Sequence, residues 1–94
     1  MRIVMFENSK IAVATALNLP KDVVLGEVLV SFVGRHCVVI ENYRKILIYT
    51  DTLVKLQAKN CKVIINGKRL MIEYYTDDEM KITGLLQSVE FEGL

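Results

Sequence analysis

An internal repeat constrains the fold of this chain more than any other feature of its sequence. Residues 30–42 match residues 54–66 at an offset of 24, and residues 51–67 match residues 77–93 at an offset of 26. A repeat of this length predicts a small group of secondary-structure elements that is used several times and buries a shared core. The matched positions include one small residue and one valine in each copy: Gly34, Ala58 and Gly84, and Val39, Val63 and Val89.

Alternating apolar and polar residues indicate that each copy begins with a β-strand. Successive side chains of a strand point to opposite faces, so a lysine between two apolar residues faces away from the core. A shift of one residue would bury the lysines, and the register is therefore well specified. The predicted inward set is Val30, Phe32, Val54, Leu56, Met80 and Ile82, and the predicted outward set is Ser31, Lys55 and Lys81.

Further apolar runs and polar turns bring the prediction to about eight short strands. A third strand at residues 46–49 recurs at residues 70–74. Asn66-Gly67 lies between two apolar runs, and this pair favours a tight hairpin turn because a type I′ turn needs positive φ at both central positions. The threonine and aspartate residues at 50–51 and 76–78 predict polar turns that lead into the next copy.

These strands predict an all-β fold, a meander that forms a roll or a two-layer sandwich. A short β-solenoid with three strands per turn is the alternative, since a fixed period also suits stacked coils. One short helix of about residues 9–17 is expected at the N-terminus, capped by Asn8 or Ser9 and ended before Pro20. The chain is thus expected to be a single domain, 1–94, with a helical segment at about 1–20 and the β repeat at about 28–92.

Residue types that carry chemistry are sparse. His36 is the only histidine, and its neighbour Cys37 would point to the opposite face of a strand, which argues against a nucleophilic pair. Cys37 and Cys61 lack metal-ligand spacing and are expected to be buried free thiols in a reducing compartment. The acidic residues 77–79 lack calcium-loop spacing and suit a solvated turn. We therefore expect no catalytic residue, no cofactor and no metal, and a protein that is not an enzyme.

The charge balance limits the classes of partner. Lys and Arg total 12 against 11 for Asp and Glu, so the chain lacks the positive field that non-specific nucleic-acid binding needs. Lys55, Lys59 and Lys81 are expected to share one exposed face, where they serve solubility or attract an anionic surface. No signal peptide and no transmembrane segment are expected, because the apolar run at 11–17 is too short to span a bilayer.

Tyrosine is the residue type that indicates a partner surface, because it is enriched at protein interfaces and is also common on half-buried strands. The tyrosines fall in or near the third strand of each copy. The predicted partner surface consists of Tyr43, Tyr49, Tyr74 and Tyr75.

Short segments in a fixed order connect this sequence with a known family. They are Leu17–Val24, Val33-Gly34, Ile40–Arg44, Tyr49–Asp51, Val54–Leu56, Gly67, Ile82–Gly84 and Val89–Phe91. Their order and spacing resemble the YabP/YqfC family of sporulation proteins, and are closest to its YqfC branch. The resemblance implies a role in endospore formation, in the cytoplasm of the mother cell, beside a sporulation membrane protein as partner, and it brings no catalytic residues.

The first functional hypothesis is therefore a non-enzymatic structural or assembly factor of sporulation that acts through protein–protein contacts and forms a homo-oligomer. Exposed sheet edges offer a route for strand-by-strand association. The alternative is a small β-barrel that binds a ligand or nucleic acid, which requires a concave site that strand spacing cannot reveal.

Overall fold

A computed structural model describes residues 26–93, which form six β-strands. The predicted helix at about 9–17 lies outside the described residues. The strands are β1 (Leu29–Val33), β2 (Cys37–Glu41), β3 (Lys45–Tyr49), β4 (Leu53–Gln57), β5 (Cys61–Tyr75) and β6 (Glu79–Gly93). They make one open sheet in the order β1-β2-β6-β5-β4-β3.

Every strand pair in this sheet is antiparallel. The all-β prediction is confirmed, and strands β3 to β6 follow one another as a meander. The alternative of a β-solenoid is wrong, because solenoid coils stack their strands in parallel. The first hairpin, β1–β2, joins the meander through pairing of β2 with the first part of β6.

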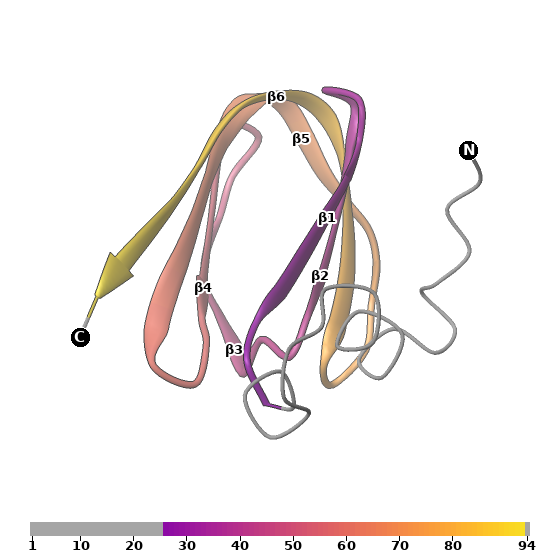
Figure 1. The fold of residues 1–94 in the computed structure, drawn as a ribbon. Helices are drawn as coiled ribbons and strands as arrows, with labels where there is room; N and C mark the ends of the chain where they lie inside the picture. Colours follow the sequence, from indigo (N-terminus) through magenta and orange to yellow (C-terminus); the bar gives the residue numbers. More distant parts are fainter. Residues whose placement is uncertain (1–25, 94) are drawn as a thin grey trace.

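The sheet folds over across the middle of β5 and β6 (Figure 1). One arm holds β1, β2, the first part of β6 and the second part of β5. The other arm holds β3, β4, the first part of β5 and the second part of β6. We call the end where β5 and β6 bend the apex, and the opposite end, where the chain turns at residues 42–44, 58–60 and 76–78, the open end.

The hairpin predicted at Asn66-Gly67 is wrong, because both residues lie inside β5. A Cβ on Gly67 would lie 2.3 Å from the carbonyl oxygen of Leu85 on β6. Glycine is needed here because the two backbones approach too closely for a side chain. The pattern read as two strands and a turn is one bent strand, so the structure has six strands where about eight were expected.

Gly84 plays the matching part in β6. Its φ is +140°, and a Cβ there would lie 2.7 Å from the carbonyl oxygen of Arg69. Arg69 itself has a positive φ of 54° where the register between Lys68 and Met71 shifts. Extra residues of this kind increase bend and twist, so the bulge and the two glycines together fold the long hairpin over.

The core lies between the two arms and follows the predicted alternation. Val54, Leu56, Met80 and Ile82 are fully buried, as predicted. Phe32 is the exception, 46% exposed, because β1 is an edge strand with no neighbour on its outer side. The same core cluster takes residues from both arms, namely Val38, Ile40, Tyr43, Val54, Leu56, Ala58, Val63, Ile65, Leu70, Met80, Ile82 and Leu86.

The turns at both ends are held by backbone and threonine hydrogen bonds. Thr50 Oγ1 accepts from the Leu53 amide at 3.0 Å, and Thr76 Oγ1 accepts from the Glu79 amide at 3.1 Å. These are the polar turns predicted at residues 50–51 and 76–78. At the open end the β2–β3 connection crosses between the arms, where the Asn42 amide donates to the Asp78 carbonyl at 2.6 Å.

Candidate interaction surface

Tyr43 is the one predicted surface tyrosine that is buried. Only 5% of it is exposed, and its hydroxyl donates to the backbone carbonyl of Thr76. Burial raises the pKa of the Tyr43 hydroxyl, and the nearby Tyr75, Asp77 and Asp78 raise it further. Tyr43 therefore closes the core at the open end and is not available to a partner in this structure.

Tyr49 lies on the edge strand β3 and reaches the other arm. It pairs with Val54, whose side chain faces the core, so Tyr49 points toward the space between the arms. Its hydroxyl accepts a hydrogen bond from the Ile72 amide of β5 at 3.1 Å. This contact brings the edge strand β3 beside the second part of β5.

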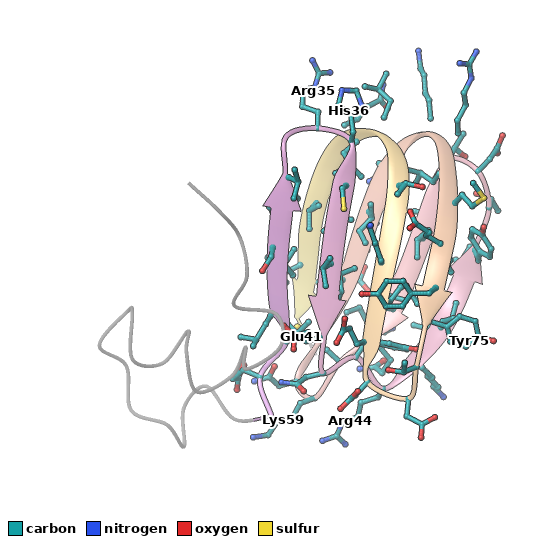
Figure 2. The ribbon with its side chains drawn as sticks, turned by 90° about the vertical axis from the view of Figure 1, so that its right-hand side faces the viewer. Arg35, His36, Glu41, Arg44, Lys59 and Tyr75 are labelled. Atoms are coloured by element: carbon teal, nitrogen blue, oxygen red, sulfur yellow. The ribbon has the colours of Figure 1, made fainter. Side chains whose placement is uncertain are left out.

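Tyr74 and Tyr75 both lie at the end of β5. The Tyr74 hydroxyl donates to Glu79 Oε2 at 2.7 Å, and this bond is the main reason that the pKa of Tyr74 is raised to about 12. Tyr75 is the most exposed of the large apolar residues at 63%, and Figure 2 shows it toward the open end. Tyr74 and Tyr75 thus lie on the same strand that Tyr49 contacts at Ile72.

Exposed large apolar side chains are concentrated on the same two strands. Ten large apolar residues of the described chain are exposed, and six of them belong to β3 or to the second part of β5. The alternation of the sequence did not predict that Leu47, Ile48 and Met71 are exposed. It assigns side chains to the two faces of a strand, but it does not show which strands lie at the edges of the sheet. We call this set the tyrosine edge: Leu47, Ile48, Tyr49, Met71, Tyr74 and Tyr75.

Both strands of the tyrosine edge have an unpaired backbone side. β3 is the last strand of the sheet. β4 pairs with β5 only as far as Asn66, so residues 71–75 of β5 pair with β6 alone. Unpaired strand edges present free amide and carbonyl groups that can pair with another chain. The tyrosine edge therefore combines exposed apolar area with open backbone hydrogen-bonding positions, apart from the Ile72 amide, which donates to the Tyr49 hydroxyl.

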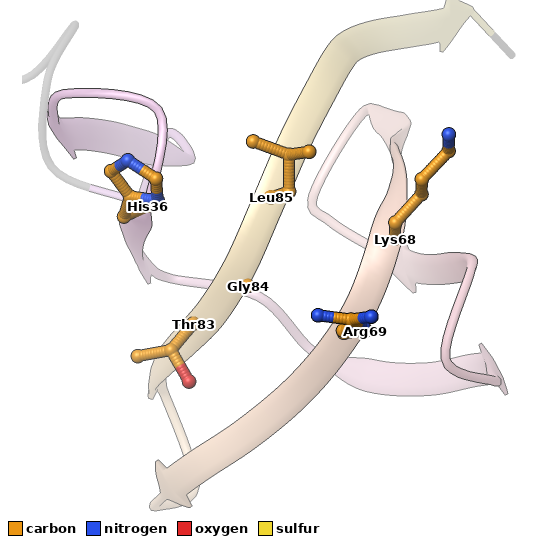
Figure 3. Close-up of a pocket in the computed structure, with 6 residues that line it drawn as sticks. All are labelled: His36, Lys68, Arg69, Thr83, Gly84 and Leu85. Atoms are coloured by element: carbon orange, nitrogen blue, oxygen red, sulfur yellow. The ribbon is translucent and has the colours of Figure 1, made fainter.

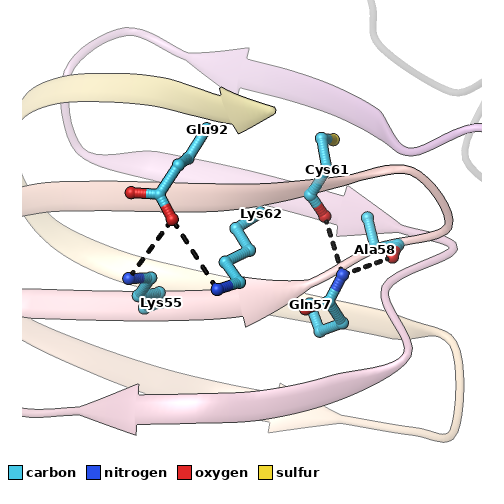
Figure 4. A network of polar contacts seen from close by, with 6 residues as sticks. All are labelled: Lys55, Gln57, Ala58, Cys61, Lys62 and Glu92. Carbon is cyan, nitrogen blue, oxygen red and sulfur yellow. Dashed lines mark hydrogen bonds and ion pairs between the residues drawn. The ribbon is translucent and has the colours of Figure 1, made fainter. Parts of the chain in front are cut away.

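The lysines predicted to share a face lie on different parts of the molecule, so that prediction is wrong. Lys55 is on β4 and, together with Lys62, forms an ion pair with Glu92, with nitrogen–oxygen distances of 3.6 and 3.7 Å (Figure 4). Lys81 is on the other arm and pairs with Glu73 at 3.4 Å. Lys59 lies in the β4–β5 turn at the open end. Because the sheet folds over at the apex, strands that hold equivalent positions in the sequence repeat lie on different arms.

The thiols and the acidic groups are the remaining candidate chemical groups within residues 26–93. Cys37 and Cys61 are free thiols that are partly exposed. The pKa of the Cys61 thiol is raised, mainly by burial and to a smaller extent by the negative charge of Glu27. A thiol with a raised pKa is a weaker nucleophile at neutral pH because less of it is thiolate. Over the same residues, no three His, Cys, Asp or Glu side chains gather as a metal site would require.

Fold and surface together define a small antiparallel β-protein with an open sheet and exposed edges. The YabP family model matches residues 26–93, the stretch that holds all six strands. The chain belongs to the YabP family, and this membership indicates a sporulation-related protein. Comparison with curated proteins and with solved structures gave no significant match. Across residues 26–93, no helix has the length and apolar character needed to cross a bilayer.

Proposed function

We propose that this chain is a non-enzymatic assembly factor of sporulation that acts through protein contacts at the tyrosine edge. The first of these contacts is with a second copy of the chain, so that the protein forms a homo-oligomer. The observation that carries the proposal is the concentration of six exposed large apolar residues on two strands with unpaired edges.

Strand addition is the mode of contact that suits this surface. An added strand forms main-chain hydrogen bonds along the open edge, while alternate side chains pack against the apolar residues beside it. β3 carries only one charged residue, Lys45, and natural edge strands use charges to discourage such pairing. Tyrosine supplies contact area at a small cost in conformational entropy, which favours its use at an interface.

The family supplies the setting of the proposal. A protein of the YqfC branch in the mother-cell cytoplasm would carry the same edge to a sporulation membrane protein as its second partner. β3 pairs with β4 on its other side, so self-association and binding of a different protein would use its single unpaired side as alternatives.

Light scattering of the purified chain between about 10 μM and 1 mM tests the self-association, a range that covers weak and moderate affinities. We expect the mass to rise with concentration. Ile48→Lys places a charge on the exposed edge strand and should keep the mass at that of the 10.7 kDa monomer. Phe91→Lys is the matched control, because Phe91 is 61% exposed but lies on β6, outside the tyrosine edge.

A strict monomer at the highest concentration would contradict self-association. If Phe91→Lys abolished association as fully as Ile48→Lys, the tyrosine edge would be the wrong surface.

A further inference from the structure

The apex carries a group of basic side chains that the tyrosine edge does not use. Arg35 and His36 belong to the β1–β2 turn, and Lys68 and Arg69 belong to the bend of β5. All four are exposed, and no ion pair among residues 26–93 involves any of them. Asp51 lies beside the bend of β5, since its backbone carbonyl accepts from the Leu70 amide at 2.7 Å.

Backbone hydrogen bonds hold the β1–β2 turn, which carries two of these residues, against β6. The carbonyl of Arg35 accepts from the Leu86 amide at 2.8 Å, and that of His36 accepts from the Gly84 amide at 3.2 Å. The β1–β2 turn is thereby fixed against the bend of β6. The β1–β2 turn and the bend of β6 therefore form one platform, and the backbone that carries Arg35 and His36 is positioned before any ligand arrives.

The platform has a shallow hollow at its centre. Its volume is about 670 Å³, and Figure 3 shows Arg69 and His36 on either side of the β6 backbone at Gly84, with Lys68 farther along β5. Gly84 lines the hollow with backbone atoms alone, and the Arg69 carbonyl oxygen lies 2.7 Å from the position that a Cβ would take. Its lining residues are His36, Lys68, Arg69, Thr83, Gly84 and Leu85.

Exposed apolar side chains flank the basic ones. Leu85 is 36% exposed in the hollow, and Val33, beside the β1–β2 turn, is 51% exposed. Residue 93 and the start of β1 both lie away from the apex (Figure 1). A protruding end that combines cations with apolar side chains fits a surface that offers negative charge above an apolar interior.

We propose that the apex docks on the anionic surface of a lipid bilayer. Arg35, Lys68 and Arg69 attract the phosphate groups, the hollow receives one headgroup, and Val33 and Leu85 enter the boundary between headgroups and acyl chains. In this orientation the tyrosine edge runs away from the membrane plane and stays open to protein partners, so docking and assembly are compatible.

Co-sedimentation with vesicles tests the docking. The probes are vesicles of phosphatidylcholine alone and vesicles with about 30% phosphatidylglycerol, in about 0.1 M and 0.5 M NaCl. We expect the chain to bind the anionic vesicles in low salt, to bind them less in high salt, and not to bind the neutral ones. No binding to anionic vesicles in low salt would overturn the proposal.

Two matched triple variants locate the contact. Arg35→Gln/Lys68→Gln/Arg69→Gln removes the apex charges, and Arg44→Gln/Lys45→Gln/Lys59→Gln removes three exposed charges from the open end (Figure 2). Both lower the formal net charge equally, from +1 to −2, since +1 − 3 = −2. One basic residue at an anionic surface changes partitioning about fivefold, so the apex variant should bind about 100-fold less. The open-end variant should bind as the unmodified chain does.

Equal loss in both variants would overturn the proposal, because it would show attraction by net charge alone. Inorganic phosphate and a short single-stranded DNA are the competing probes. Tight binding of either one at the apex, without vesicle binding, would assign the site to a soluble anion and overturn docking.

Discussion

Gly84 shows at the scale of one residue why the sheet can fold over. Its φ of +140° is a conformation that residues with a Cβ rarely adopt, and the Arg69 carbonyl oxygen occupies the place of a Cβ. Gly84→Ala should therefore lower the free energy of unfolding by about 3 kcal/mol, measured by urea denaturation. Gly93→Ala, where a Cβ would meet nothing within 4 Å, should change it by less than about 0.5 kcal/mol. Equal, small effects would contradict the bend described at Gly84.

Tyr43 gives a second prediction at this scale. Its hydroxyl is buried and donates to the Thr76 carbonyl, so Tyr43→Phe should lower the free energy of unfolding by about 1 kcal/mol. Tyr75→Phe is the control, because Tyr75 is 63% exposed and its hydroxyl has no hydrogen bond to another side chain or carbonyl of residues 26–93. A larger effect at Tyr75 than at Tyr43 would place the wrong tyrosine in the core.

The hydroxyl of Tyr74 should make the stability of the fold depend on pH in the alkaline range. Its pKa is raised to about 12 in the folded state, mainly by the hydrogen bond to Glu79, so the unfolded chain loses this proton first. The stability that this bond contributes is fully present below the unfolded pKa of about 10 and is lost as pH rises from about 10 to 12. In an absorbance titration of the phenolates, Tyr74 and the buried Tyr43 should both titrate late, and Tyr74 should titrate earlier in Glu79→Gln. An unchanged late titration in that variant would contradict the role of Glu79.

Single residues also show which parts of the core and of the surface could be predicted from the sequence alone. Alternation correctly placed Val54, Leu56, Met80 and Ile82 in the core, because lysines at the intervening positions fix the register. It could not separate Tyr43 from the other tyrosines, because burial of Tyr43 depends on the crossing between the arms at the open end. The basic apex was likewise missed, since its members come from turns far apart in sequence.

At the scale of elements, β5 is where prediction and structure differ most. Asn66-Gly67 satisfies the local requirements of a hairpin turn, whereas the close approach of Leu85 is a tertiary contact that a local pattern does not contain. Instead of a turn, Asn66 pairs with Ser88 on β6, and their side chains are joined by a hydrogen bond of 3.1 Å.

This difference can be tested with a disulfide. With Cys37 and Cys61 replaced by serine, Asn66→Cys/Ser88→Cys should form an intramolecular bond on mild oxidation, because the two Cα atoms are register partners. Mass spectrometry after trypsin digestion identifies the linked peptides. Failure to form the bond in a folded variant would favour a turn at Asn66-Gly67 over a continuous strand.

At the scale of the whole molecule, the order of the strands follows from pairing that local sequence signals do not specify. β2 pairs with β6 across a gap of about forty residues, and this pairing joins the first hairpin to the meander. The fold over the apex then separates the lysines of the repeat and brings β3 beside the second part of β5. The repeat predicted which residues are inside, while the bend decides which strands become edges.

The central claim is that the tyrosine edge is the surface through which this YabP family protein assembles. Hydrogen exchange at low and high protein concentration tests it most directly, because amides that become paired with another chain exchange more slowly. We predict slower exchange at high concentration in residues 45–49 and 71–75, with no change in β1. The claim would be contradicted if exchange became slower in β1 alone, or if no amide of residues 26–93 exchanged more slowly at high concentration.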